Sequence, residues 1–253
     1  MLRAERLEII RNLAKENEII SWEKLNSYLD ASKATIRRDI EQLESEGVAR
    51  KTRGGVIFPR VKGSEPSNEI RKYHNTDAKG RIAEAALDFI SDHDFVMLDS
   101  GSTVLELAKR IPKERRIGVV TYYFEAARIV SDNENAEVFL LGGKVRKGFY
   151  TCHGFMAEKM LEEFHANVCF LGADGVDVQR GITGYNALDV PLKQIMMKHS
   201  DKVILLCDHS KFESNAYMYI AKMDQIDVVI TDSETSETDI RTMQEGGIEV
   251  IVV

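Results

Sequence analysis

The sequence predicts a small N-terminal winged helix-turn-helix domain followed by a larger, Rossmann-like α/β domain with a mostly parallel sheet. Two observations lead to this fold class. Residues 1–58 contain three helical stretches and then a glycine-containing hairpin pattern. From residue 77 onward, helical stretches alternate with short apolar segments rich in β-branched residues. That alternation is typical of a parallel sheet covered by helices.

The N-terminal elements have recognisable starts and apolar stripes. Ser21 and Ser32 each precede a helical stretch and are expected to cap it. In the third stretch, Ile36, Ile40 and Leu43 recur at helical spacing and are expected to face the core. The expected elements are, in order, helices over 2–17, 22–29 and 33–46 and a hairpin over 48–58.

The remainder of the chain divides into a linker and the α/β domain. Residues 59–76 are expected to form the linker, because they include Pro59, Gly63 and Pro66 and show little periodicity. The α/β domain is expected over 77–253. Its strands are expected over 95–98, 117–121, 137–141, 168–171, 203–206, 228–231 and 249–252. Its helices are expected over 78–90, 103–110, 124–131, 156–164, 190–199 and 238–245.

Composition excludes several classes of protein. The 253 residues contain no apolar run near the roughly 20 residues of a membrane helix, and the N-terminus has no apolar signal core. The three cysteines lack CxxC spacing, which argues against a disulfide framework and a cysteine-rich zinc site. Cys152-His153 and Cys207-Asp208-His209 have no second ligand pair at metal spacing. We therefore expect a soluble cytoplasmic protein with no metal, no cofactor and no membrane partner.

The charges of the chain are unevenly distributed. Residues 1–62 contain 13 Lys and Arg against 10 Asp and Glu, whereas the remaining residues contain 21 against 31. The net charge of −7 therefore hides a mildly basic N-terminal segment on an acidic body. This asymmetry indicates that the first segment is the part that meets a polyanion.

The third helical stretch has the layout of a DNA-reading helix. Its cations and hydroxyls lie near its start and away from the apolar stripe. The positive end of the helix dipole lies at the same end of the helix. Arg can form bidentate bonds to guanine, and Lys and Thr can hold phosphates. The alternative is a solvated, charged helix face. The expected DNA-binding residues, including those of the hairpin wing, are Ser32, Lys33, Thr35, Arg37, Arg38, Lys51, Arg53 and Gly54.

Two further clusters point to a small-molecule site. Asp99-Ser100-Gly101-Ser102-Thr103 follows a predicted strand and opens a predicted helix, which is the geometry of an anion cradle or of an ordinary capped turn. Asp174 and Asp177 follow another strand, where α/β folds place ligands. Lys193 lies four residues after Asp189. It forms either a surface ion pair with that residue or a contact with a ligand phosphate.

These motifs resemble those of the DeoR family of bacterial transcription regulators. Residues 34–40, Ala-Thr-Ile-Arg-Arg-Asp-Ile, resemble the signature of its DNA-reading helix, and residues 50–55 resemble its wing, where His often stands at position 53. Four motifs that resemble the family's sensor domain follow in the family's order. They lie at 99–103, 140–143, 170–175 and 208–212.

The resemblance implies a repressor of a carbohydrate-metabolism operon whose affinity for double-stranded operator DNA is controlled by a phosphorylated sugar. It also implies a C-terminal domain similar to ribose-5-phosphate isomerase, in which a Ser/Thr-Gly loop holds the phosphate and a Gly-Ala-Asp stretch lies beside the sugar. Residues 100–103 and 172–174 match these segments. The expected effector-binding residues are Asp99, Ser100, Gly101, Ser102, Thr103, Asp174, Asp177, Lys193 and Lys211.

Departures from both patterns leave alternatives open. The isomerase's Lys-Gly-Gly-Gly segment is not matched at 180–184, so we expect binding without catalysis. Tyr122, Leu188 and His209 depart from the regulator pattern. One alternative is an active sugar-phosphate isomerase or deaminase with an accessory DNA-binding segment. Another is a constitutive DNA-binding protein whose α/β domain only oligomerises. A homo-oligomer, dimer or tetramer, is expected because one winged module covers only a half-site.

Overall fold

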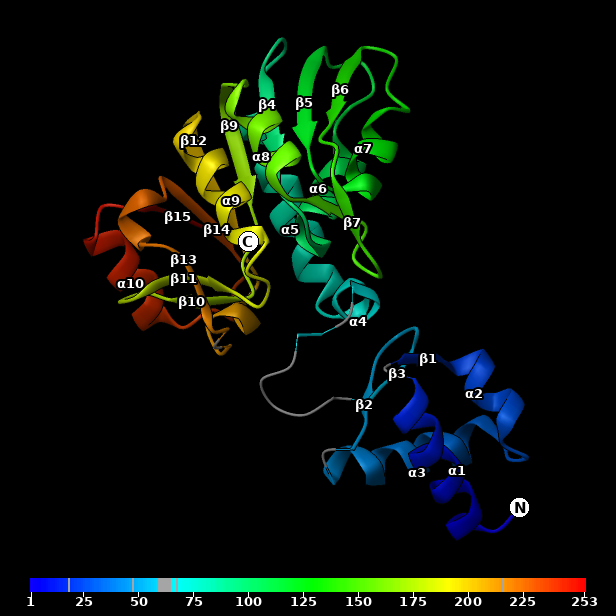
Figure 1. Cartoon of the computed structure of the whole chain (residues 1–253). Coiled ribbons are helices and arrows are strands. Elements are labelled where there is room, and N and C mark those ends of the chain that lie inside the picture. Colours follow the sequence, from blue (N-terminus) through cyan, green and yellow to red (C-terminus); the bar gives the residue numbers. More distant parts are fainter. Residues whose placement is uncertain (18, 47, 59–64, 67, 215) are drawn as a thin grey trace. The chain divides into compact units, whose positions relative to one another are not determined.

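The computed structural model describes residues 1–17, 19–46, 48–58, 65–66, 68–214 and 216–253. The chain divides into two compact units, Met1–His74 and Asn75–Val253. Each unit has its own hydrophobic core and its own sheet (Figure 1). No helix in the described part of the chain is both long enough and apolar enough to cross a membrane.

The first unit has the predicted winged helix-turn-helix plan. The short segment before α2 is a strand that pairs antiparallel with β3, and β3 pairs with β2 to form the wing. This gives a three-stranded sheet with the order β1-β3-β2. The elements are α1 (Arg3–Glu16), β1 (Ile19–Ser21), α2 (Trp22–Tyr28), α3 (Lys33–Ser45), β2 (Arg50–Lys51), β3 (Gly55–Ile57) and α4 (Asn68–Tyr73).

Helix α3 is fixed by its apolar stripe, as expected from the sequence. Ile36, Ile40 and Leu43 have no exposed surface, and they pack with residues of α1, α2 and β3 in one cluster. The wing strand β3 approaches β1 closely at Gly55, where a Cβ atom would lie 2.2 Å from the carbonyl oxygen of Ile20. Only glycine allows this approach, which explains the second glycine of the hairpin pattern.

The second unit is built on a seven-stranded parallel sheet, which confirms the predicted α/β fold. The strand order is β15-β14-β12-β9-β4-β5-β6. The strands are β4 (Phe95–Leu98), β5 (Ile117–Thr121), β6 (Ala136–Leu140), β9 (Ala166–Leu171), β12 (Ser200–Leu206), β14 (Val228–Thr231) and β15 (Glu249–Val252).

Helices cover both faces of this sheet. Helices α5, α6 and α7 contribute to one core cluster, and α8, α9 and α10 contribute to the other. Within β4, Val96 and Leu98 belong to the first cluster and Met97 to the second, as the two-residue period of a strand requires. The helices are α5 (Thr76–Ala86), α6 (Ser102–Arg110), α7 (Phe124–Val130), α8 (Phe155–Glu162), α9 (Asp189–Lys198) and α10 (Glu237–Glu245). Short 3₁₀ turns lie at Leu87–Phe89, His209–Lys211 and Met223–Gln225.

Five short strands were not predicted. β7 (Lys144–Arg146) pairs with β8 (Thr151–His153), and β10 (Gly175–Asp177), β11 (Gly181–Gly184) and β13 (Met218–Ala221) form an antiparallel sheet. Each has only three or four residues, and most contain glycine or charged residues, so none produces a clear strand pattern.

The predicted linker contains structure as well. Residues 59–64 and 67 lie outside the described residues, but helix α4 covers Asn68–Tyr73 and α5 begins at Thr76. The sequence pattern missed α4 because its six residues are too few to show helical periodicity. The boundaries of the two functional domains at 1–58 and 77–253 stay a prediction.

Candidate DNA-reading surface and effector site

Helix α3 carries most of the residues predicted to contact DNA. The Oγ atom of Ser32 accepts a hydrogen bond from the backbone N–H of Thr35 at 3.2 Å and lies 2.9 Å from the Thr35 hydroxyl. Both hydroxyls therefore contribute to the helix cap. Lys33, Arg37 and Arg38 are exposed on the same helix, outside its buried stripe. Helix α3 thus carries three exposed cations, and two of them, Lys33 and Arg37, line one pocket.

Asp39 follows the two arginines but faces the interior. Its carboxylate accepts a hydrogen bond from Arg6 Nε at 2.6 Å and lies 3.4 Å from Arg3 Nε. Asp39 is 1% exposed, so this contact joins α1 to α3 inside the unit. The acidic residue of the signature therefore holds the helix in place, while the neighbouring arginines remain on the surface.

The predicted DNA-binding residues of the wing differ in their surroundings. Arg53 and Gly54 are exposed in the turn between β2 and β3. The ammonium of Lys51 instead lies 3.0 Å from a carboxylate oxygen of Glu41 and 3.6 Å from one of Glu44, both on α3. The hydrogen bond to Glu41 raises the pKa of Lys51. Lys51 therefore connects the wing to α3, and a contact with DNA would have to compete with these ion pairs.

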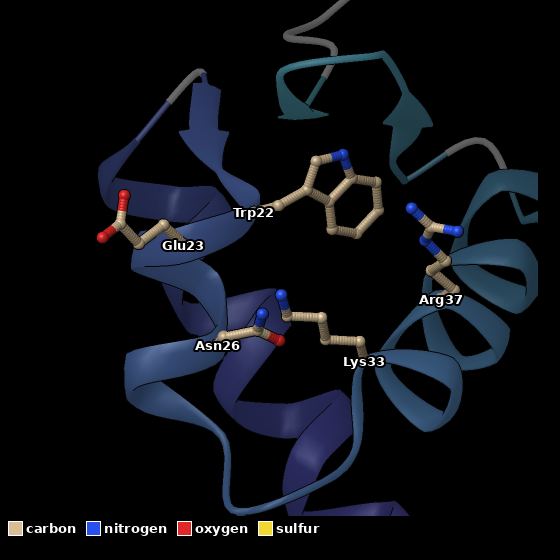
Figure 2. Close-up of a pocket in the computed structure, with 5 residues that line it drawn as sticks. All are labelled: Trp22, Glu23, Asn26, Lys33 and Arg37. Atoms are coloured by element: carbon tan, nitrogen blue, oxygen red, sulfur yellow. The ribbon is translucent and has the colours of Figure 1, made fainter.

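A pocket of about 470 Å³ opens between α2 and α3. Figure 2 shows that its wall combines one aromatic ring with two cations, and the guanidinium of Arg37 lies 5.8 Å from the centre of the Trp22 ring. The lining residues are Trp22, Glu23, Asn26, Lys33 and Arg37.

The second candidate site lies where the order in which the chain adds strands to the parallel sheet reverses. The chain builds β4, β5 and β6 outward on one side, then crosses over and places β9 on the other side of β4. The carboxyl ends of β4 and β9 therefore border the topological switch point, where α/β folds bind ligands. Asp99 follows β4 and Gly172 follows β9, and the Gly172 N–H donates to the Asp99 carboxylate at 2.7 Å.

Asp99 is the centre of a buried hydrogen-bond network. Its carboxylate accepts from the hydroxyl of Tyr122 and from the ammonium of Lys193, which also donates to the Gly172 carbonyl at 2.8 Å. Burial and the nearby Asp99 raise the pKa of Tyr122 well above its usual value, so its hydroxyl remains a donor. Asp99 has no exposed surface and Lys193 only 6%. Two of the three Lys193 donors are thus used within the protein.

The predicted anion cradle lies directly beside this network. Helix α6 begins at Ser102, and Gly101 before it has a φ of +118° with open space around the position of a Cβ. The first N–H groups of a helix have no partner one turn earlier. Ser102 and Thr103 lie in this first turn, and the Ser100 hydroxyl is 3.1 Å from the Tyr122 hydroxyl. The loop therefore has the donors that an anion needs.

Asp189 supplies a second carboxylate near this network, and one of its oxygen atoms accepts no hydrogen bond from the described residues. Asp189 begins α9 and is 9% exposed, and its Oδ1 atom has no hydrogen-bond donor among the described residues. That atom lies 3.4 Å from Nε2 of His153, and Oδ2 lies 4.0 Å from the Arg146 guanidinium. Burial raises the pKa of Asp189 to about 6, and the opposing effect of Lys193 does not cancel this increase.

The other predicted effector-binding residues, Asp174, Asp177 and Lys211, form hydrogen bonds or ionic interactions outside the Asp99 network. Asp174 accepts the Tyr185 N–H at 3.0 Å, whereas Asp177 accepts the N–H groups of Gln179 and Arg180 in the turn after β10. Asp174 and Asp177 therefore occupy the two ends of one short strand. Lys211 lies in the 3₁₀ turn after β12 and acts electrostatically on Asp208.

Sequence reasoning missed three contributors to this site. The sequence indicates Tyr122 only as a departure from the family pattern, His153 only as part of a potential metal pair, and Asp189 only as a surface partner of Lys193. Each lies within or beside the Asp99 network. The one available signal was the position of Tyr122 directly after a predicted strand.

One group of potential metal ligands occurs in the described chain. Ligand atoms of His209, Asp232 and Glu234 lie within 4.8 Å of one another at the carboxyl ends of β12 and β14. The Asp232 carboxylate already accepts from the His209 backbone and ring and from the Glu234 N–H. These hydrogen bonds connect the ends of β12 and β14, and this structural role explains why the three side chains lie together.

A winged helix-turn-helix unit and an α/β unit with a candidate ligand site at its switch point are the parts of a ligand-responsive DNA-binding protein. The sequence matches the DeoR-like helix-turn-helix domain over residues 6–61 and the DeoR C terminal sensor domain over residues 74–233. The chain belongs to the DeoR family of transcription regulators.

Similar proteins extend over nearly the whole chain. It is 30% identical over 250 residues to the HTH-type transcriptional regulator GolR of Listeria innocua, covering 99% of this chain and 98% of that protein. It is 31% identical over 252 residues to the HTH-type transcriptional repressor GlcR of Bacillus subtilis, covering 100% and 97%. A solved ribose 5-phosphate isomerase A from Methanocaldococcus jannaschii covers 54% of each chain, with 19% identity and a TM-score of 0.41.

Proposed function

We propose that this protein is a transcriptional repressor of a carbohydrate-metabolism operon and that a phosphorylated sugar bound to residues 77–253 controls its affinity for operator DNA. Residues 1–58 are the DNA-binding domain in this proposal, and residues 59–76 connect it to the sensor. The protein is a homo-oligomer that acts on chromosomal DNA in the cytoplasm. GlcR, similar over its whole length, is a repressor by name, which supports this direction of regulation.

The DNA-binding part of the proposal rests on α3 and the wing turn. Lys33, Arg37 and Arg38 are exposed on α3, and Arg53 is exposed in the turn. An α-helix of this kind fits the major groove, where Arg reads guanine edges and Lys neutralises phosphates. Ser32 and Thr35 act mainly through the helix cap, and Lys51 acts mainly by fixing the wing.

The effector part of the proposal rests on the Ser100–Thr103 loop. Its helix N-terminus and hydroxyls bind the phosphate, and the third Lys193 donor is available to it. Asp99 is a positioning residue, because its carboxylate is fully enclosed by protein donors. The incompletely satisfied Asp189 carboxylate and Asp174 accept sugar hydroxyl groups in this arrangement.

The observation that carries the proposal is the open helix start of α6 beside the buried Asp99–Lys193 pair, in a chain that also has an exposed basic helix. The test is a thermal-shift screen of the full-length protein against phosphorylated and unphosphorylated sugars. A bound effector at 100 times its dissociation constant adds about 2.7 kcal/mol to the stability. The effector found in this way must then change the affinity for DNA in a mobility-shift titration.

An enzymatic function is the second candidate, and the properties of Asp189 favour it. Asp189 is buried, its pKa is raised by burial to about 6, and it interacts electrostatically with Asp99 and Lys193, which are properties of a general base in this site. An isomerase would move a proton between adjacent carbons of a sugar phosphate. Turnover of pentose or hexose phosphates by the purified protein would support this candidate, whereas binding without turnover supports the regulator.

A further inference from the structure

Trp22, which lines the pocket of Figure 2, connects α2 to both the wing turn and α3. It is the first residue of α2, and its indole Nε1–H donates to the carbonyl oxygen of Thr52 at 3.0 Å. Its backbone N–H donates to the Gly54 carbonyl at 3.3 Å. Thr52 and Gly54 both belong to the wing turn. On its other side, the Trp22 ring faces the guanidinium of Arg37 on α3.

We propose that Trp22 is a positioning residue for DNA recognition, which holds the Arg37 guanidinium against its ring and fixes the wing turn beside α3. The inference rests on the proposed DNA-binding function and goes beyond it by assigning a role to a residue outside α3 and the wing. In this role Trp22 need not contact a base. It acts through Arg37 and through the wing.

The physical reason is the conformational freedom of an exposed arginine. Arg37 has a long side chain that loses rotamer freedom when it binds a base or a phosphate. A guanidinium held over an aromatic ring is ordered before DNA arrives, so less freedom is lost on binding. Because Arg37 also borders open pocket space, part of its N–H edge remains available to DNA.

The hydrogen bonds of Trp22 add a second constraint. The wing turn contains Arg53, and Lys51 of the neighbouring strand β2 forms ion pairs with Glu41 and Glu44 of α3. The indole N–H adds a connection from α2 to the turn itself, and this connection helps to position Arg53 relative to the DNA-reading helix. A side chain that fills the same space without an N–H or an aromatic face cannot do this.

Arg38 provides an internal comparison. It follows Arg37 directly and is also exposed, but successive residues of a helix point about 100° apart. A role of Trp22 that depends on its ring therefore couples to Arg37 and not to Arg38. A role in packing alone would be independent of both arginines.

The experiment uses the full-length protein and a DNA duplex that the wild-type protein selects from a random-sequence library. Affinities for this duplex are measured for Trp22→Phe, Trp22→Leu, Arg37→Ala, Arg38→Ala and the double variants of Trp22→Leu with each arginine change. Tyr28→Leu, which removes an exposed aromatic ring from the same helix, is the matched control. Circular dichroism and melting temperature verify that each variant is folded.

We expect Trp22→Leu to weaken binding about two- to fivefold and Trp22→Phe, which keeps the ring but not the N–H, to recover the part of this loss that depends on the ring. The effect of Trp22→Leu diminishes in the Arg37→Ala background, where only the contribution through the wing is left, and persists in full in the Arg38→Ala background. Wild-type affinity in Trp22→Leu, or an undiminished effect in the Arg37→Ala background, would overturn the inference.

A measurement without DNA covers the case in which Trp22→Leu does not fold. Trp22 is the only tryptophan of the chain, so tryptophan fluorescence reports on the surroundings of this ring alone. Arg37→Ala should expose the ring and raise the acrylamide quenching constant above the wild-type value, whereas Arg38→Ala leaves it unchanged. Equal quenching in all three proteins contradicts the contact. Failure of the wild-type protein to enrich any duplex instead contradicts the proposed DNA-binding function.

Discussion

Lys193 and Asp99 form a buried ion pair although 94 positions separate them in the sequence. Asp99 follows β4 and Lys193 lies in α9, and the Gly172 loop after β9 bonds to both. Lys193 therefore has a structural role, and the predicted contact with a phosphate would be a second role of the same ammonium group. Its ammonium first neutralises a carboxylate that has no access to solvent.

Lys193→Ala should destabilise the second unit, because it leaves Asp99 charged and buried without its cation. Breaking such a pair from one side costs about 3–5 kcal/mol. The double variant Asp99→Asn/Lys193→Met should recover part of this loss, since it removes both charges. Urea unfolding of the full-length protein measures the effect. An unfolding free energy equal to that of the wild type would mean that Asp99 does not need its partner.

Thr103→Ala should abolish or strongly weaken the response to the effector while the affinity for DNA without effector stays the same. Thr103 lies in the first turn of α6, where a phosphate would accept from its hydroxyl and backbone N–H. Thr238→Ala is the matched control, because Thr238 occupies the second position of α10 and is exposed. DNA affinity is titrated with and without the effector from the thermal-shift screen. A normal response in Thr103→Ala would move the phosphate site elsewhere.

Asp189 should make the stability of the protein depend on pH between about pH 4 and pH 6. Its pKa is raised by burial from 3.8 to about 6, so in this range the native state keeps a proton that the unfolded chain has lost. The free energy of unfolding therefore falls as pH rises through this range, by at most about 1.4 kcal/mol per pH unit. Above about pH 6 the loss is complete.

Asp189→Asn removes this contribution, and Asp132→Asn, an exposed carboxylate on a turn, serves as its control. The measured quantity is the difference in unfolding free energy between each variant and the wild type at several pH values. For Asp189→Asn the difference should change across the range in favour of the variant at the higher pH. A difference that is independent of pH would show that burial does not raise this pKa.

Arg37→Ala and Arg38→Ala should each weaken operator binding without unfolding the first unit, because both side chains are exposed on α3. Loss of a base contact costs about 1–3 kcal/mol at one base-pair position, whereas loss of a phosphate contact lowers the salt slope by about one. Lys113→Ala removes an exposed cation from the second unit and should have no effect. Wild-type binding by both arginine variants would refute the assignment of α3.

Helix α8 should form part of a subunit interface in a dimer. Phe155 and Met156 are 67% and 63% exposed, and Met160 on the same helix is 38% exposed. Apolar side chains grouped in this way are typical of protein–protein contacts. Met156→Glu should shift the full-length protein toward the monomer in sedimentation equilibrium at micromolar concentration. Val252→Glu, on the edge strand β15, should not. A monomeric wild-type protein would contradict the dimer itself.

The parts of the fold that could be predicted depend on local signals. Ser32 and the Ile36, Ile40 and Leu43 stripe define α3 within a dozen residues, and the parallel strands are short β-branched runs. The β7–β8 hairpin and the β10-β11-β13 sheet could not be predicted, because their pairing is decided by contacts with distant segments.

The same distinction applies to the candidate site. The Asp99–Thr103 loop was predictable, since a strand followed by small residues and a helix is a local pattern. The pairing of Asp99 with Tyr122 and Lys193 was not, because it depends on the strand order. The burial of Asp189, which raises its pKa, likewise results from packing that residue spacing does not reveal.

The long sequence separation within the Asp99–Lys193 pair also determines when the site forms during protein synthesis. Ribosomes add about 5–20 residues per second, and domains fold as they emerge. The contacts of α3 with α1 and the wing are complete once the first 74 residues are made. The Asp99–Thr103 loop, in contrast, lacks the buried ammonium of Lys193 until α9 has left the ribosome. A nascent or truncated chain that ends before α9 should therefore have a folded DNA-binding unit but lack the effector site proposed above.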